Sequence, residues 1–330
     1  MATTTRSAPA LTSVAVRGAS AAAEIYRSAR AHGFPAEPNL NLRNFGGRTI
    51  EHLTFTNVYL GAAGAWSVDD VERIDRALAA AMSDAHLNNV LAQYYADGKP
   101  TTQFKPSRML PGPLPQRVFR DTVEGFVAGL EASNVLSGFD LTSTVFCFML
   151  PPGVVLVDGN KGGHAEHADE EDDSPNVALR ERDEAVDSKH GLGGYHGSIH
   201  PKRGGKTETV YYAVGVYSEG ANGIVAFDEP WKSICATFYH ELCEARTDPD
   251  VEDAIRAGNN PKGNAFLGWY SLRGGEIGDI PMEEAGADLS GVMQEVPLAK
   301  GGTAPVQLMW SNAVGGPEGP IAAPHAAVPA

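Results

Sequence analysis

The segment from Trp231 to Thr247 places His240, Glu241 and Glu244 within an apolar, aromatic stretch whose length and composition predict a buried helix. His240 and Glu244 are four positions apart, so in a helix they project from one face about one turn apart. Glu241 points about 100° away around the helix axis. Burying such groups without partners is costly, so the remainder of the chain has to supply partners for them.

The pattern His240-Glu241-Leu242-Cys243-Glu244 has the spacing of a metal-binding helix. In His-Glu-x-x-His hydrolases, the first and last residues bind zinc and the intervening glutamate takes a proton from water. Glu244 stands where the second histidine is usual, and a carboxylate is also a competent zinc ligand. The predicted cofactor is therefore Zn²⁺, with Mn²⁺ as the alternative that an oxygen-richer ligand set favours.

A third ligand is expected from the glycine-rich segment Gly275-Glu276-Ile277-Gly278-Asp279. Glu276 is the predicted metal ligand, and Asp279 is predicted to orient the imidazole of His240, as carboxylates behind metal sites commonly do. Asp248 either orients a ligand in the same way or caps the end of the helix.

His196 is a second candidate catalytic residue. Its imidazole can donate to the oxyanion of a tetrahedral intermediate or complete the metal coordination. The alternative is a loop histidine bonded to the backbone. Tyr195, Tyr239 and Tyr270 are alternative donors, and the sequence does not choose among them.

The rest of the chain predicts an α+β fold in which a mixed sheet packs on the helix of residues 231–247. Apolar or alternating runs predict strands at 50–60, 143–157, 207–217 and 306–310. Helical spacing predicts further helices after Ser67, over about 84–95 and over 121–132.

The predicted domain organisation is a flexible N-terminal tail at 1–45, one catalytic domain at 46–314 and a disordered C-terminal tail at 315–330. The tails are rich in small residues and proline. Residues 158–190 are strongly charged, which predicts a mobile acidic insertion that can act as a lid.

The net charge of −15 argues against nucleic acid or an anionic membrane as the main partner. The sequence has no apolar run of transmembrane length and no clear signal peptide, so we expect a cytoplasmic protein. The chain has three cysteines, a small and odd number that does not fit a disulfide framework.

The chain resembles the plant phosphate-induced, Exordium-like proteins, most strongly over residues 194–312 and more weakly from about residue 55. The matching residues are Gly194-Tyr195-His196-Gly197, His240-Glu241-Leu242-Cys243-Glu244, Thr247-Asp248-Pro249, Trp269-Tyr270, Glu276-Ile277-Gly278-Asp279 and Trp310-Ser311. Two cysteines of that family are replaced here, by Gly193 and within Ile280-Pro281. The resemblance implies a zincin-like fold, and the lost cysteines fit a relative that needs no disulfides.

The predicted function is that of a metal-dependent hydrolase of the peptidase type. His240, Glu244 and Glu276 hold the metal, Glu241 is the general base, and the substrate is a peptide or a small amide. Two alternatives remain open: a non-catalytic, metal-containing binding module, and a metalloenzyme that acts on a small molecule in a biosynthetic pathway.

Overall fold

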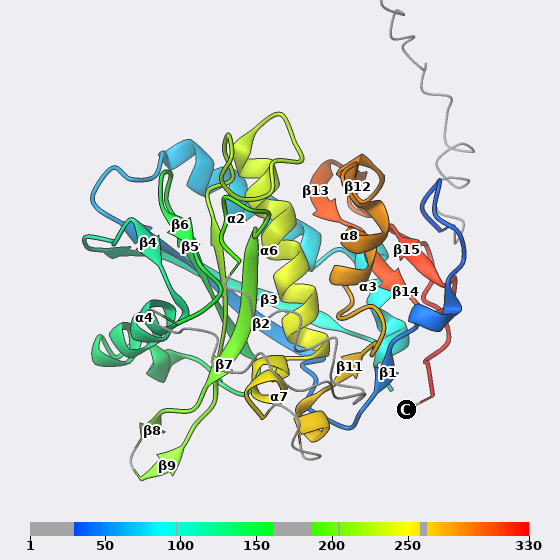
Figure 1. Cartoon of the computed structure of the whole chain (residues 1–330), viewed down its shortest axis with the longest axis horizontal. Helices are drawn as coiled ribbons and strands as arrows, with labels where there is room; N and C mark the ends of the chain where they lie inside the picture. The colour runs from blue at the N-terminus through cyan, green and yellow to red at the C-terminus, as the bar shows by residue number, and fades with distance from the viewer. Residues whose placement is uncertain (1–29, 97, 161–185, 204, 258–262, 330) are drawn as a thin grey trace, which may run out of the picture.

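A computed structural model describes residues 30–96, 98–160, 186–203, 205–257 and 263–329 of the chain (Figure 1). The fold is α+β around a five-stranded mixed sheet in the spatial order β3-β2-β5-β10-β7. Its strands are β2 (His52–Gly61), β3 (Thr101–Pro111), β5 (Thr144–Leu150), β7 (Gly194–Ile199) and β10 (Val210–Val216). Neighbouring strands run parallel except at one edge, where β7 is antiparallel to β10.

The helices are α2 (Val68–Met82), α3 (Ala85–Leu91), α4 (Arg120–Ala132), α6 (Pro230–Thr247), α7 (Val251–Ala257) and α8 (Asp279–Ala285). The shorter strands are β1 (Arg43–Asn44), β4 (Arg117–Val118), β6 (Val155–Leu156), β8 (Lys202–Arg203), β9 (Lys206–Thr207), β11 (Trp269–Tyr270), β12 (Met293–Pro297), β13 (Thr303–Gln307), β14 (Met309–Ser311) and β15 (Gly316–Glu318).

The central sheet is buried on both faces, and alternate residues of each strand point to different cores. Cys147 of β5 packs with α2 and α6, whereas its neighbours Phe146 and Phe148 pack with α4. Parallel strands covered on both faces are continuously apolar, which is why the sequence of β5 has no polar alternation. Figure 1 shows α6 lying across the sheet beside β7 and β10.

Helix α6 begins at Pro230, where a proline is tolerated because the first backbone N–H groups of a helix have no internal acceptor. It ends at Thr247, with the backbone N–H of Asp248 bonded to the carbonyl of Glu244 and Pro249 immediately following. From Ser233 to Thr247 every side chain except that of His240 is buried. The functional helix is therefore a core element of the protein.

The structure confirms the predicted helices at α2, α4 and α6 and the predicted strands at β2, β5 and β10. The Ser67 hydroxyl caps α2 by accepting from the Asp70 backbone N–H, as the sequence indicates. The predicted strand at 306–310 is instead divided between β13, which pairs with β12, and β14, which pairs with β15. The helix expected over 84–95 is α-helical only as far as Leu91, and a 3₁₀ turn follows at Ala92–Tyr94.

The prediction of a disordered tail at 315–330 is wrong for the residues that the structure describes. Residues 316–318 form β15, and the side chains of Glu318 and Ile321 are buried. The N-terminal boundary at 45 is also too late, because Arg30 pairs with Glu318 and Arg43 pairs with Tyr270. Small and proline-rich segments can be ordered when the folded core offers them strand partners. Residues 1–29 of the predicted N-terminal tail lie outside the described residues, as do residues 161–185 of the acidic insertion.

Among the described residues, no helix has both the length and the apolar character required to cross a bilayer.

We expect Phe238→Ala to lower the free energy of unfolding by about 3–5 kcal/mol, because its ring is fully buried between α6 and the sheet. Phe266→Ala is the matched control, since that ring is 42% exposed, and its effect should stay within about 1 kcal/mol. Urea unfolding followed by circular dichroism measures both. Equal effects of the two changes would contradict the packing of α6 described above.

Candidate metal centre

Seven polar side chains converge where α6 passes the edge strand β7 and the turn before α8. They are His240, Glu241 and Glu244 from α6, His196 from β7, Glu276 and Asp279 from the turn and the start of α8, and Gln307 from β13. The segment 276–279 lies beside α6 because the backbone N–H groups of Gly278 and Asp279 bond to the carboxylate of Glu244, and the N–H of Trp310 in β14 bonds to the carbonyl of Ile277. The cluster is thus assembled by four elements far apart in the sequence.

Glu244 is held at the centre of this cluster by the protein backbone. Its Oε1 accepts from the N–H groups of Gly278 and Asp279, at 3.0 and 3.1 Å. Its Oε2 lies 3.0 Å from Nε2 of His240 and 3.7 Å from Nδ1 of His196. One carboxylate oxygen is therefore occupied, and the other faces both imidazoles.

Gln307 determines which nitrogen of His240 carries a proton. The Gln307 amide donates to the carbonyl of Gly278 at 2.6 Å, so its Oε1 has to be the group that meets Nδ1 of His240 at 2.9 Å. This network assigns the Nδ1–H tautomer. In neutral His240, the lone pair of Nε2 consequently faces Oε2 of Glu244. Two acceptors at this separation need a proton or a metal ion between them.

His196 has a similar arrangement on the other side of Glu244. Its Nε2 donates to the backbone carbonyl of Asp248 at 3.1 Å. Its Nδ1 then points between Glu241 and Glu244, with carboxylate oxygens at 3.6 and 3.7 Å. The alternative of a loop histidine bonded to the backbone is right about the hydrogen bond, to the carbonyl of Asp248, but not about the loop, because His196 lies in β7 with its side chain buried.

The side chains form two groups with the spacing of metal ligands, and Glu244 belongs to both. The outer group consists of His240, Glu244 and Asp279, and the inner group consists of His196, Glu244 and Glu276. All three residues of the inner group are buried, whereas His240 and Asp279 are partly exposed. The predicted set of His240, Glu244 and Glu276 is thus divided, because His240 and Glu276 fall in different groups.

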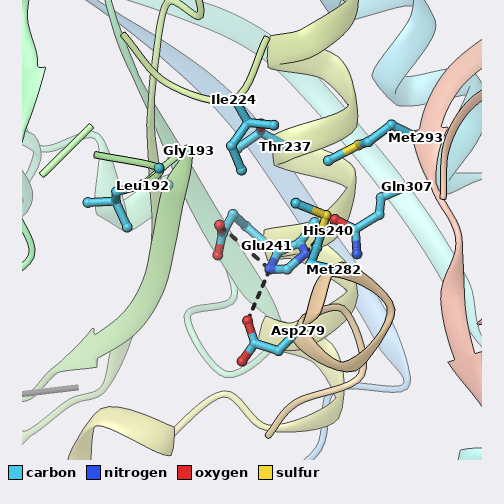
Figure 2. Close-up of a pocket in the computed structure, with 12 residues that line it drawn as sticks. Leu192, Gly193, Ile224, Thr237, His240, Glu241, Asp279, Met282, Met293 and Gln307 are labelled. Atoms are coloured by element: carbon cyan, nitrogen blue, oxygen red, sulfur yellow. Dashed lines mark hydrogen bonds and ion pairs between the residues drawn. The ribbon is translucent and has the colours of Figure 1, made fainter. Parts of the chain in front are cut away.

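A cavity of about 180 Å³ opens beside the outer group (Figure 2). His240, Glu241 and Asp279 line it together with the apolar side chains of Leu192, Ile224, Met282 and Met293. The Thr237 hydroxyl, one helical turn before Glu241, lines it too and has no hydrogen-bond partner in the structure. A small molecule in this cavity would therefore meet two carboxylates, one imidazole, one hydroxyl and an apolar wall.

Burial and mutual charge change the acidity of the cluster. Burial raises the pKa of Glu241 and, together with the charge of Glu244, raises that of Glu276 well above its ordinary value. Burial opposes the charged form of His240, but the carboxylates of Glu244 and Glu241 outweigh it and raise its pKa to about 10. The pKa of His196 is likewise raised by Glu276 and Glu241 in spite of its burial.

Asp248 lies next to the inner group without belonging to it. Its Oδ1 accepts from the N–H of Gly268 at 2.8 Å, and its carbonyl holds His196. Burial raises the pKa of Asp248 to about 8. Asp279, predicted to orient His240, lies 4.0 Å from Nε2 of that residue, and Gln307 takes the nitrogen that an orienting group would hold.

Tyr195 and Tyr239 make their contacts away from the cluster, and Tyr270 belongs to another apolar cluster. Tyr195 stacks on Tyr212 on the opposite face of the sheet from His196. Tyr239 packs in the core between α6 and α2, and Tyr270 packs against Val251. These positions favour Thr237 over the tyrosines as a donor at the cavity.

Gln307, Thr237 and Gly278 have roles that the sequence analysis missed. Gln307 follows three buried residues of β13, and a buried amide in a strand is the signal that points to a polar partner. Gly278 has no such signal. A β-carbon at Gly278 would lie 2.5 Å from Nδ1 of His240 and 2.9 Å from Oε1 of Glu244, so only glycine fits between them.

Comparison with family models, curated proteins and solved structures finds no match to this chain. The resemblance to the Exordium-like proteins stays a prediction from the quoted residues.

We expect binding of Zn²⁺ or Mn²⁺ to release protons at neutral pH. His240, whose pKa is raised to about 10, carries a proton at pH 7 that a metal ion has to displace. Affinity should therefore rise as the pH rises toward 10, by about tenfold per pH unit for each proton displaced. Titration of the metal-free protein in weak buffer with a pH indicator measures this release. A pH-independent affinity would show that His240 is not a ligand.

We expect Gly278→Ala to weaken metal binding by about 10–100-fold, because the new methyl group displaces His240 and Glu244. The Gly278 backbone is in the right-handed helical region, so alanine adds no backbone strain. Gly129→Ala in α4, where a β-carbon meets no atom, is the matched control and should leave affinity unchanged. Isothermal titration calorimetry compares the two variants, and similar affinities would contradict the placement of the turn.

Proposed function

We propose that the protein is a metal-dependent hydrolase of the peptidase type, with a zincin-like arrangement of helix, edge strand and metal site. The observation that carries this proposal is the outer group at the cavity. His240, Glu244 and Asp279 converge there, and Glu241 lines the cavity next to them. Three protein ligands leave a coordination position for water, as catalytic sites require.

The ligand set fits a divalent ion of intermediate hardness. One imidazole and two carboxylates suit Zn²⁺, and the excess of oxygen also suits Mn²⁺. The direction of His240 supports the fit, because the Gln307 hydrogen bond at Nδ1 leaves Nε2, once it has lost its proton, to face Glu244 and a metal ion. When bound, the ion polarises the substrate carbonyl and lowers the pKa of water toward neutrality.

The protein's own side chains supply the proton transfers. The raised pKa of Glu241 brings this carboxylate closer to the neutral range in which a general base works best. Glu241 accepts the proton of the attacking water and passes it to the leaving amine. The Thr237 hydroxyl, buried at the cavity wall without a partner, is placed to donate a hydrogen bond to the substrate.

The cavity limits the substrate to a peptide or a small amide with a compact apolar group beside the bond that is cleaved. Leu192, Ile224 and the two methionines offer no charged partner for a substrate side chain. The volume of about 180 Å³ suits one small side chain. Such a cavity is also compatible with a small-molecule amide from a biosynthetic pathway.

A non-catalytic metal-binding module is the second candidate, and the closed inner group favours it. His196, Glu244 and Glu276 are all buried, which is typical of structural sites. Turnover separates the two candidates, because a structural ion stabilises the fold without accelerating hydrolysis.

We expect Glu241→Gln to keep the metal and lower turnover by about a hundred- to ten-thousandfold, because an amide cannot accept the proton. His240→Ala should lose both the outer metal ion and turnover. The assay is hydrolysis of a library of fluorogenic peptides and small amides by the Zn²⁺- or Mn²⁺-loaded protein. Metal content is measured in parallel.

Glu72→Gln on the exposed surface of α2 is the matched control and should retain full activity. Full activity of Glu241→Gln would refute the general-base assignment. Metal binding without hydrolysis of any library member would favour the binding module.

A further inference from the structure

We infer that the inner group is a second metal site, which binds a divalent transition cation and shares Glu244 with the outer ion. The inference rests on the proposed function for the outer ion but is carried by different residues. The ligands of the inner site are His196, Glu244 and Glu276. The result would be a two-metal centre bridged by one carboxylate.

The inner group has the geometry of a closed site. Oε1 of Glu276 lies 3.5 Å from Nε2 of His196, and Oε2 of Glu244 lies 3.7 Å from Nδ1 of the same ring. The three ligands come from β7, α6 and the turn before α8, and each is at least 96% buried. The two distances run to different nitrogens of the His196 ring. The ligand spacing itself is that one atom from each of the three residues lies within 4.8 Å of the other two.

An unsatisfied carboxylate oxygen points to a missing ligand. Oε1 of Glu276 is buried and accepts no hydrogen bond. The nearest donor, Nε2 of His196, directs its hydrogen to the Asp248 carbonyl at 3.1 Å instead. The second carboxylate oxygen of Asp248 is also buried without a partner. Buried polar atoms are rarely left in this state, and a cation bound by the inner group would satisfy Oε1 of Glu276.

The charge of the cluster supports two ions better than one. Five carboxylates meet here, those of Glu241, Glu244, Asp248, Glu276 and Asp279, against the imidazoles of His196 and His240. With every carboxyl ionised, both imidazoles protonated and no metal, the formal charge is −5 + 2 = −3. One divalent ion with His196 still protonated gives −5 + 2 + 1 = −2, and two ions with neutral imidazoles give −5 + 4 = −1.

The two cations of α6 do not offset this charge. The ammonium group of Lys232 pairs with Asp228, Glu229 and Glu295. The guanidinium of Arg246 points away from the cluster and bonds to Asn88 and to the backbone carbonyl of Glu51. Protonation of the buried carboxyls is the other way to relieve the repulsion, and metal content distinguishes the two.

Glu244 is suited to bridge the two ions. The backbone N–H groups of Gly278 and Asp279 hold Oε1, which leaves Oε2 between the two imidazoles. An oxygen shared in this way places two ions about 3.5–4 Å apart, the spacing of two-metal hydrolases. The outer ion faces the cavity, whereas the inner ion is enclosed, so a chelator should remove the outer ion first.

The experiment measures metal content and metal–metal coupling in the full chain. Protein stripped with a chelator is reloaded with Mn²⁺, dialysed and analysed for bound manganese and by electron paramagnetic resonance. We expect about two equivalents and a spin-coupled spectrum, because the bridging oxygen joins the two ions. His240→Ala and His196→Gln should each retain about one equivalent with the spectrum of isolated ions, whereas the exposed His32→Ala should match the unchanged protein.

One equivalent in the unchanged protein would overturn the second site and leave the proposed function standing. No bound metal would overturn both. Two equivalents of metal in His196→Gln would overturn the inner site, because His196 would then not be a ligand. No bound metal in a folded His196→Gln would also overturn it, because the two ions would then not be held at separate sites. If His196→Gln fails to fold by circular dichroism, Glu276→Gln replaces it with the same expected loss of one equivalent, and the coupled spectrum of the unchanged protein still decides the question.

Discussion

The hydrogen bonds from Gly278 and Asp279 to the carboxylate of Glu244 tie helix α6 to the turn before α8. They occupy one carboxylate oxygen and aim the other at both histidines. The glycine leaves the space that His240 and Glu244 fill, and the Gly278 carbonyl holds Gln307, which orients His240. These hydrogen bonds hold the side chains of Glu244 and His240 in position without a ligand, which is the preorganisation that catalysis needs.

The energetic difficulty of the site is its uncompensated negative charge. Carboxylates in the core without enough cations are strongly destabilising unless they are protonated or bind metal. The charged side chains lie on the buried helix α6. The apolar core around this helix stabilises the fold and offsets the cost of burying them. Sites of this kind are maintained for function more often than for stability, which is the physical basis for proposing a metal-dependent activity.

Sequence spacing identified most of the cluster, because helical geometry makes His240 and Glu244 neighbours wherever the helix is placed. The glycine-rich segment around Glu276 and Asp279 identified these two residues as members of the cluster. The sequence could not divide the ligands between the outer and the inner group. That division depends on which side of Glu244 each side chain reaches in the folded structure. Gln307 was missed since its partner lies 67 positions away in the chain.

Read without a structure, the sequence determines the α+β class, the buried helix α6 and the strands β2, β5 and β10, because their hydrophobic periodicities are local properties. The tertiary structure decided that His196 lies on an edge strand, and that residues 316–318 form a strand instead of a disordered tail. Gly194 and Gly197 weaken the strand signal of β7 yet are required there, because a β-carbon at either position would collide with Glu241 or Glu252. Long-range packing decides which residues fit at these positions, and a local sequence pattern carries no information about that packing.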